Sequence, residues 1–181
     1  MMETELSIKR RNGGFIMTKI GWMQWILYFF LYAFAGWVWE SLYVSVLSQH
    51  WVNRGFLHGP FLPIYGFGAL LILLMTYGVR HHAVAVFFVG MIGATILEYV
   101  TGAVLDQWFH IKLWDYSLEA WNLQGYISLV SSVFWGVLAV VLVVWIHPLL
   151  SALIQVWPAW VSVSLCLTLL TVEGADLISR V

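Results

Sequence analysis

Long apolar runs constrain what this chain can fold into more than any other feature. The run from Gly21 to Leu47, GWMQWILYFFLYAFAGWVWESLYVSVL, contains Glu40 as its only charged residue. A segment of about 20 such residues is long enough to cross the hydrocarbon core of a bilayer as a helix. The whole chain is 62% hydrophobic and 9% charged, whereas a soluble domain has about 25% charged residues. The chain therefore belongs in a membrane.

The apolar pattern predicts an all-α polytopic membrane protein with five transmembrane helices. Residues 20–181 are expected to form a single transmembrane domain, and residues 1–19 a basic cytoplasmic tail. The expected spans are about 22–47, 60–77, 83–105, 123–146 and 157–178. Lys and Arg accumulate on the cytoplasmic side of membrane proteins. The tail has four of them, so the N-terminus is predicted inside and the C-terminus outside.

Composition also limits the cofactors and partners. Cys166 is the only cysteine, so neither a disulfide framework nor a cluster of thiolate metal ligands is expected. The net charge of −1 gives no reason to expect a nucleic-acid partner. No GxxxxGK[ST] phosphate loop occurs, and no cofactor is predicted. The expected partners are the lipid bilayer, a small solute, and either a separate ATPase chain or further copies in a homo-oligomer.

Two glutamates lie inside expected spans. Glu40 and Glu98 each come seven residues before a predicted outer end, at Leu47 and Leu105. At 1.5 Å per residue, each would lie about 10 Å below that end. The sequences ESLYVSVL and EYVTGAVL that begin at these glutamates are similar, which suggests a weak parallel repeat of spans 1–2 and 3–4. An ionisable residue inside a membrane is costly and usually functional.

The segment WVNRGFLHGPFLPIYG, residues 51–66, combines polar residues with two prolines and three glycines. Irregular backbone at membrane depth is tolerated only where it is buried in protein or lines a wet cavity. Arg54 is the cation best placed to neutralise Glu40 or Glu98. The segment is interpreted as the rim or floor of an outward-facing polar pocket. His58 is interpreted first as a hydrogen-bonded turn residue.

The second outer connection, residues 106–122, is rich in Trp and Tyr and is expected to lie at the headgroup level, with Trp108 and Trp114 at the interface. Asp115 and Ser117 either cap a short interfacial helix or contact substrate. Glu173 and Asp176, near the outer end of the last span, are expected to be solvated.

Several sequence blocks resemble a known family. FFLYAFAGWVWESLY, NRGFLHGPFLPIYGFG, LEYVTG, WDYS and SSVFWG occur in the order found in the bacterial family called putative ABC-transporter type IV, or putative ABC transporter permease. The resemblance covers about residues 25–148 and implies a multipass protein of the bacterial inner membrane, nominally a permease subunit. Any ATPase would be another chain. The residues carried over from the family are Gly36, Trp37, Glu40, Asn53, Arg54, Gly55, Gly59, Pro60, Pro63, Tyr65, Gly66, Glu98, Trp114, Asp115, Tyr116 and Ser117.

Together these features favour a transporter or permease component whose pocket, built on Glu40, Glu98 and Arg54, binds a small polar or cationic solute. The candidate substrate-binding residues are Glu40, Asn53, Arg54, His58, Tyr65, Glu98, Trp114 and Asp115; no catalytic or metal-binding residue is predicted. One alternative is a non-catalytic assembly or regulatory subunit. The other is an intramembrane enzyme that acts on a lipid-borne substrate, with Glu40 or Glu98 as acid or base and His58 assisting. The lack of a G-x-S-x-G motif disfavours this enzyme. A non-enzymatic role is therefore favoured.

Overall fold

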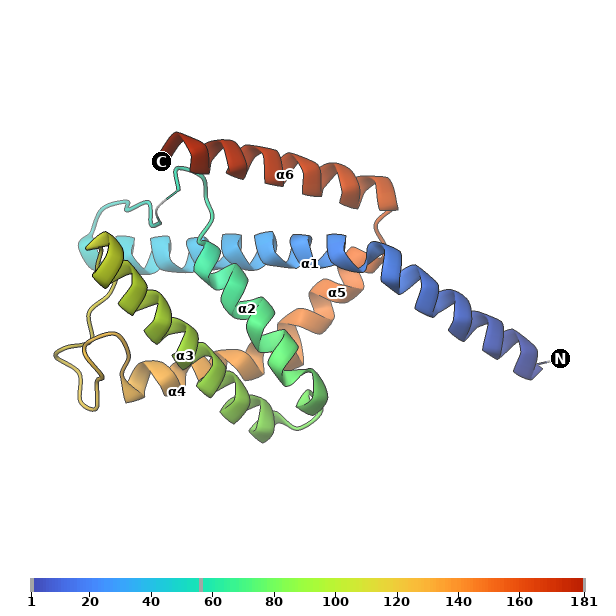
Figure 1. Ribbon diagram of the computed structural model, residues 1–181, viewed down its shortest axis with the longest axis horizontal. Helices are drawn as coiled ribbons and strands as arrows, with labels where there is room; N and C mark the ends of the chain where they lie inside the picture. Colours follow the sequence, from blue (N-terminus) through green and yellow to red (C-terminus); the bar gives the residue numbers. More distant parts are fainter. Residues whose placement is uncertain (1, 56, 181) are drawn as a thin grey trace. The chain divides into compact units, whose positions relative to one another are not determined.

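The computed structural model describes the backbone of residues 2–55 and 57–180 and the side chains of 21–55 and 57–179. This part of the chain is helical, and its β-structure is limited to one isolated bridge between Leu123 and Ile127. The elements are α1 (Met2–Ser48), α2 (Pro63–Thr76), the short 3-10 helix η1 (Tyr77–Val79), α3 (Ala83–Phe109), α4 (Leu129–Val140), the π-helical η2 (Val141–Ile146), α5 (His147–Gln155) and α6 (Ala159–Arg180) (Figure 1).

Four helical segments of the described chain are long and apolar enough to cross a membrane. They are Gly21–Ser48 within α1, Ala83–Phe109, Leu129–Gln155 and Ala159–Ser179. The helical segment Pro63–Val79 is apolar but shorter. The predicted all-α membrane architecture is therefore confirmed, whereas the count of five spans and the repeat stay predictions. The predicted basic tail, residues 1–19, falls among residues whose side chains the structure does not describe.

The largest differences from the expected boundaries lie at the two ends of the fourth expected span, 123–146. The fourth span begins at Leu129, because residues 123–127 form a turn and Ser128 caps the helix. It then continues past residue 146 through α5 to Gln155. Pro148 favoured a helix end, since proline lacks an N–H and crowds the preceding turn. The chain instead widens into the π-helical η2 just before this proline, which is one way a helix absorbs such a break.

The chain forms two compact units, Met1–Phe67 with Ile154–Val181 and Gly68–Leu153. In the second unit α3 packs against α4 through small residues. A Cβ at Gly90 of α3 would collide with Ala139 of α4, and one at Gly136 of α4 would collide with the Phe87 ring of α3. Such small residues let membrane helices approach closely. The exposed stripe of α3 is apolar and recurs every fourth residue, at Val84, Phe88, Ile92, Ile96 and Val100.

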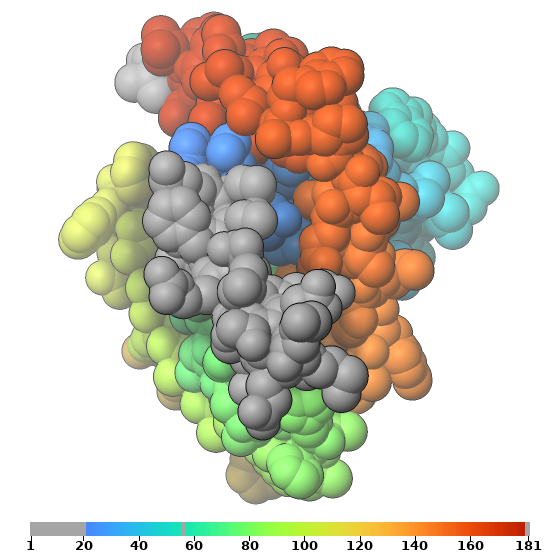
Figure 2. Space-filling model, turned by 90° about the vertical axis from the view of Figure 1, so that its right-hand side faces the viewer, coloured from blue at the N-terminus to red at the C-terminus, as the bar shows by residue number. Residues whose placement is uncertain are grey.

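In the first unit α6 packs against α1, as Figure 2 shows for α6 in red and the start of the α1 span in blue. The thiol of Cys166 lies 3.4 Å from the carbonyl oxygen of Met23, so the first half of α6 lies beside the first part of this span. The last turns of α6 bond to the connection that follows α1, through Asp176 and Gly59. The two helices therefore run in the same direction (Figure 1).

The α3–α4 contact gives a stability prediction. Gly90→Ala should destabilise the protein by about 1–3 kcal/mol, because overpacking a tight contact forces backbone shifts. Ala139 has no flexible side chain that could move away. Denaturation by sodium dodecyl sulfate, followed by tryptophan fluorescence, measures the change. The matched control is Gly78→Ala in the same unit, where a Cβ would meet nothing within 4 Å. Equal stability of the two variants would contradict the close packing.

Candidate functional site

The connection between α1 and α2, residues 49–62, turns back along α1 instead of crossing over its end. Its backbone N–H groups bond to positions progressively further from the end of α1. Val52 N donates to Ser45 Oγ at 2.8 Å, Arg54 N to Ser41 Oγ at 3.2 Å, and Leu62 N to the Ala33 carbonyl at 3.0 Å. We call residues 49–62 the re-entrant connection.

One stripe of α1 receives the re-entrant connection. Ala33, Trp37, Ser41 and Ser45 recur every fourth residue, so they lie one above another on one helix face. Trp37 contributes its indole N–H, which donates to Asn53 Oδ1 at 2.7 Å. At 1.5 Å per residue, Ala33 lies about 22 Å below the end of α1. Irregular backbone therefore reaches well down this apolar helix, and α1 accepts three of its N–H groups, as the lack of water in a membrane would require.

Glu40 of α1 is the centre of a polar cluster in the first unit. Arg54 Nε lies 3.3 Å from Glu40 Oε2, and the hydroxyl of Tyr65 donates to Glu40 Oε1 at 2.8 Å. The pairing expected between Arg54 and a glutamate is therefore present. Gly36, one turn before Glu40, leaves room for the Tyr65 ring, which a Cβ at that position would overlap. The cluster thus combines α1, the re-entrant connection and the start of α2.

The Arg54–Glu40 pair is only partly covered. The side chains are 35% and 29% exposed, respectively. Arg54 bonds the carboxylate through Nε, and within the described part of the chain its two terminal amino groups make no hydrogen bond. A guanidinium group has five N–H donors in a planar fork. The geometry therefore leaves the outer part of this fork open to a further acceptor.

Two other candidates from the re-entrant connection have structural partners. Asn53 accepts the Trp37 indole, as described above. His58 lies with its Nδ1 2.7 Å from Asp176 Oδ1 of α6. This agrees with the interpretation of His58 as a hydrogen-bonded turn residue.

The end of α6 corrects one expectation. Asp176 is not solvated: its side chain is 12% exposed, and Oδ2 accepts the Gly59 N–H at 2.8 Å. Glu173, one turn earlier, is buried at 9% exposure. Proximity to a helix end suggested solvation, but the re-entrant connection covers this face of α6. These two carboxylates were missed as candidates because nothing local in the sequence predicts that cover.

Glu98 forms a separate centre in the second unit. It is buried, and it accepts from the Tyr116 hydroxyl at 2.9 Å and from Ser131 Oγ at 3.3 Å. Since α3 continues to Phe109, Glu98 lies further from its helix end than Glu40 does. Glu98 thus accepts hydrogen bonds from two neutral hydroxyl groups, one from α4 and one from the Trp-rich segment that follows α3.

Ser128 and Ser131 have a role that sequence reasoning missed. They form a reciprocal capping box at the start of α4, and Ser128 Oγ also donates to Glu119 Oε2 at 2.5 Å. Serines three residues apart before an apolar run are the signal that could have indicated this cap. The same Ser131 that completes the cap bonds Glu98, so the helix start and the buried carboxyl are joined.

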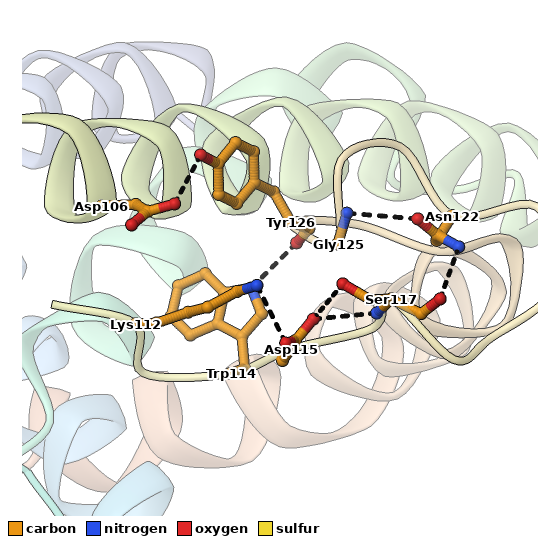
Figure 3. Close-up of polar contacts among 8 residues, drawn as sticks. All are labelled: Asp106, Lys112, Trp114, Asp115, Ser117, Asn122, Gly125 and Tyr126. Carbon is orange, nitrogen blue, oxygen red and sulfur yellow. Dashed lines mark hydrogen bonds and ion pairs between the residues drawn. The ribbon is translucent and has the colours of Figure 1, made fainter. Parts of the chain in front are cut away.

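The Trp-rich segment, residues 106–126, folds on itself in the second unit (Figure 3). The hydroxyl of Tyr126 donates to Asp106 Oδ2 at 2.8 Å, and the indole of Trp114 donates to the Tyr126 carbonyl at 2.8 Å. Trp114 is therefore bonded within the segment and partly buried, whereas Trp108 is exposed, and the placement of both at the membrane interface stays a prediction. A partly buried indole N–H needs an acceptor, and the turn at Tyr126 provides it.

Asp115 organises the neighbouring turn without capping any helix. Its Oδ1 accepts from both the amide and the hydroxyl of Ser117, at 2.9 and 2.5 Å, and its Oδ2 lies 2.9 Å from Lys112 Nζ. Gly125 lies against this turn with φ +73°, where a side chain would be both strained and in contact with Ser117. The side chains of Trp114 and Asp115 thus stabilise the fold of residues 106–126.

This turn gives a pH prediction. Hydrogen bonds from Ser117, followed by Lys112, lower the pKa of Asp115 from 3.8 to about 2. Because folding lowers this pKa, the ionised Asp115 carboxylate stabilises the turn. The stabilisation is complete above about pH 4 and is lost as the pH falls from about 4 to 2. A carboxyl NMR titration of Asp115 measures this. Ser117→Ala should return the pKa towards 3.8, whereas Ser132→Ala should leave it near 2. An ordinary pKa in the unsubstituted protein would contradict the turn.

Comparison with known proteins adds the family. No curated protein and no solved structure matches the chain. Residues 27–181 match the family described as putative ABC-transporter type IV, including the re-entrant connection, both glutamate centres and α6. The match covers far more than half of the chain. The protein therefore belongs to the putative ABC-transporter type IV family of membrane proteins.

Proposed function

We propose that this protein is a membrane component of a transport system and binds a small polar solute at Arg54, Glu40 and Tyr65. The observation that carries the proposal is the partly exposed Arg54 side chain, anchored through Nε with its two terminal amino groups unbonded in the described chain. Family membership supports a transport-related role. The wider pocket that includes Glu98 stays a prediction.

The charge balance at this site favours a solute with acceptor oxygens. Glu40 is already compensated by Arg54 and Tyr65, so a cationic solute would compete with an existing ion pair. The open N–H groups of Arg54 suit a carboxylate, a phosphate or a hydroxyl-rich solute, because charge-assisted bonds to guanidinium are strong and directional. Of the polar or cationic solutes considered from sequence, the polar class fits better.

The five-span topology is part of the same proposal. The parallel directions of α1 and α6 support an odd total number of spans, because the first and last spans point the same way only when that number is odd. The four long segments alone would leave α6 antiparallel to α1. The segment Pro63–Val79 is the apolar helix available for the fifth crossing, and it can be short because the re-entrant connection has already carried the chain down to the level of Ala33.

This topology places the re-entrant connection and the Arg54 site on the outer side of a bacterial inner membrane, with the N-terminus in the cytoplasm. The Lys and Arg excess in residues 1–19 supports that orientation. An ATPase, if one drives transport, is a separate chain, since this sequence has no phosphate loop.

A second candidate function is a non-catalytic assembly subunit. The observation that favours it is Glu98, which is buried and satisfied by Tyr116 and Ser131 within its own unit. A carboxyl with such partners can hold helices together without binding a solute. Solute binding requires the Arg54 guanidinium, whereas the assembly role based on Glu98 does not. Substitution of Arg54 therefore distinguishes the two functions.

Fusions to reporters at both ends test the topology. Alkaline phosphatase, which is active outside, should be active at the C-terminus and inactive at the N-terminus. Green fluorescent protein, which is fluorescent inside, should show the opposite pattern. The physical reason is the odd number of crossings implied by parallel α1 and α6. Reporters that place both termini on one side would contradict five spans.

Arg54→Lys tests the solute site. Lys keeps the charge that pairs with Glu40 but loses the planar fork. Acetate, inorganic phosphate and glucose serve as probes of stabilisation against heat, with the protein in lipid nanodiscs. At least one should stabilise the unsubstituted protein, and Arg54→Lys should weaken its binding by about ten- to a hundredfold, the effect of losing one charged hydrogen bond.

Arg80→Lys is the matched control, since Arg80 lies over the Tyr77 ring in the other unit. It should retain the binding. Equal binding by the Arg54→Lys variant, or no stabilisation by any probe, would favour the assembly subunit instead.

A further inference from the structure

We propose that Glu173 of α6 is a proton-binding site, closed by the re-entrant connection. The Glu173 side chain is buried at 9% exposure, and its Oε2 has no hydrogen-bond partner among the described residues. A buried carboxyl oxygen without a partner is rare and calls for an explanation, such as a bound proton, water or ion. This site is separate from the solute site and does not depend on it.

The surroundings of Glu173 leave little room for a ligand larger than a proton on the side of the re-entrant connection. Oε1 faces Gly59, and a Cβ at that glycine would lie 2.7 Å from it. The same Gly59 donates its N–H to Asp176, one turn further along α6. Glycine is thus required because the backbone and the Glu173 carboxyl touch. Within the described residues, no group of three His, Cys, Asp or Glu side chains could hold a metal ion.

No described charge compensates Glu173. On its own helix the facing group is Asp176, which is acidic and bonded to Gly59 and His58. From the re-entrant connection, His58 lies on this side of α6, but its ring bonds Asp176. The described part of the α1 span has one charged residue, Glu40, which is paired with Arg54.

An ionised carboxylate in this position would be both buried and next to a like charge. Each factor favours the neutral acid. We therefore infer that Glu173 takes up one proton to form the carboxylic acid and that Asp176 keeps its charge. Loss of that proton would place two carboxylates beside Gly59. Repulsion between groups three residues apart on a helix would then weaken the docking of the re-entrant connection on α6.

Infrared difference spectroscopy of the protein in nanodiscs at pH 7 tests the inference. The carboxylic-acid C=O band should lose one component in Glu173→Gln and keep it in the control Glu119→Gln, whose glutamate is partly exposed. Glu173→Asp should shift that component, which keeps the test valid if Glu173→Gln folds poorly. An unchanged band in both Glu173 variants would overturn the proposal.

Two further arms separate proton binding from cation binding and from the solute site. Replacing choline chloride by sodium or potassium chloride at constant ionic strength should leave the band unchanged. Loss of the Glu173 component in either salt would identify a metal cation as the ligand and overturn proton binding. Arg54→Lys should keep the component even where it abolishes solute binding, so failure of the solute site and failure of the proton site give different results.

Discussion

The rule that backbone polar groups within a membrane must be hydrogen-bonded governs the first unit of this protein. The re-entrant connection exposes N–H groups alongside α1, and the serine hydroxyls of Ser41 and Ser45 accept them. Those bonds fix the position of Arg54 directly beside Glu40. On its other side the connection bonds Asp176 through Gly59. The ion pair, the packing of Tyr65 on Gly36 and the cover over Glu173 all follow from where this connection lies.

Much of the architecture could be predicted because membrane helices need long apolar runs, and these are visible in sequence. Boundaries were less predictable where a local signal competed with the surroundings. Pro148 would ordinarily end or kink a helix. The π-helical η2 precedes it, however, and the chain remains helical to Gln155. Residues 123–127 read as apolar helix, but a turn and the cap at Ser128 delay the start of α4. In both places interactions among a few neighbouring residues decide where the helix begins or ends. A hydrophobicity pattern averaged over a whole span does not resolve such local interactions.

The candidate site was predictable only where charge compensation demanded it. A lone arginine beside a membrane glutamate implies a pair, and Arg54 does pair with Glu40. The same reasoning failed for Glu173 and Asp176, which seemed close enough to a helix end to reach water. Their burial depends on His58 and Gly59, more than a hundred residues away in sequence. No spacing pattern can indicate such a non-local contact, since it results from the path of the re-entrant connection.

The two glutamate centres show how similar sequences can acquire different chemistry. Each glutamate accepts a hydrogen bond from a tyrosine that follows it in the chain, Tyr65 for Glu40 and Tyr116 for Glu98, at 2.8 and 2.9 Å. This shared pattern is what a repeat of spans 1–2 and 3–4 would retain. The second partner differs: Glu40 has the arginine of the re-entrant connection, whereas Glu98 has the serine that caps α4. An ion pair that stays partly exposed can exchange partners with a solute, but a buried carboxyl bonded to neutral hydroxyls holds helices together.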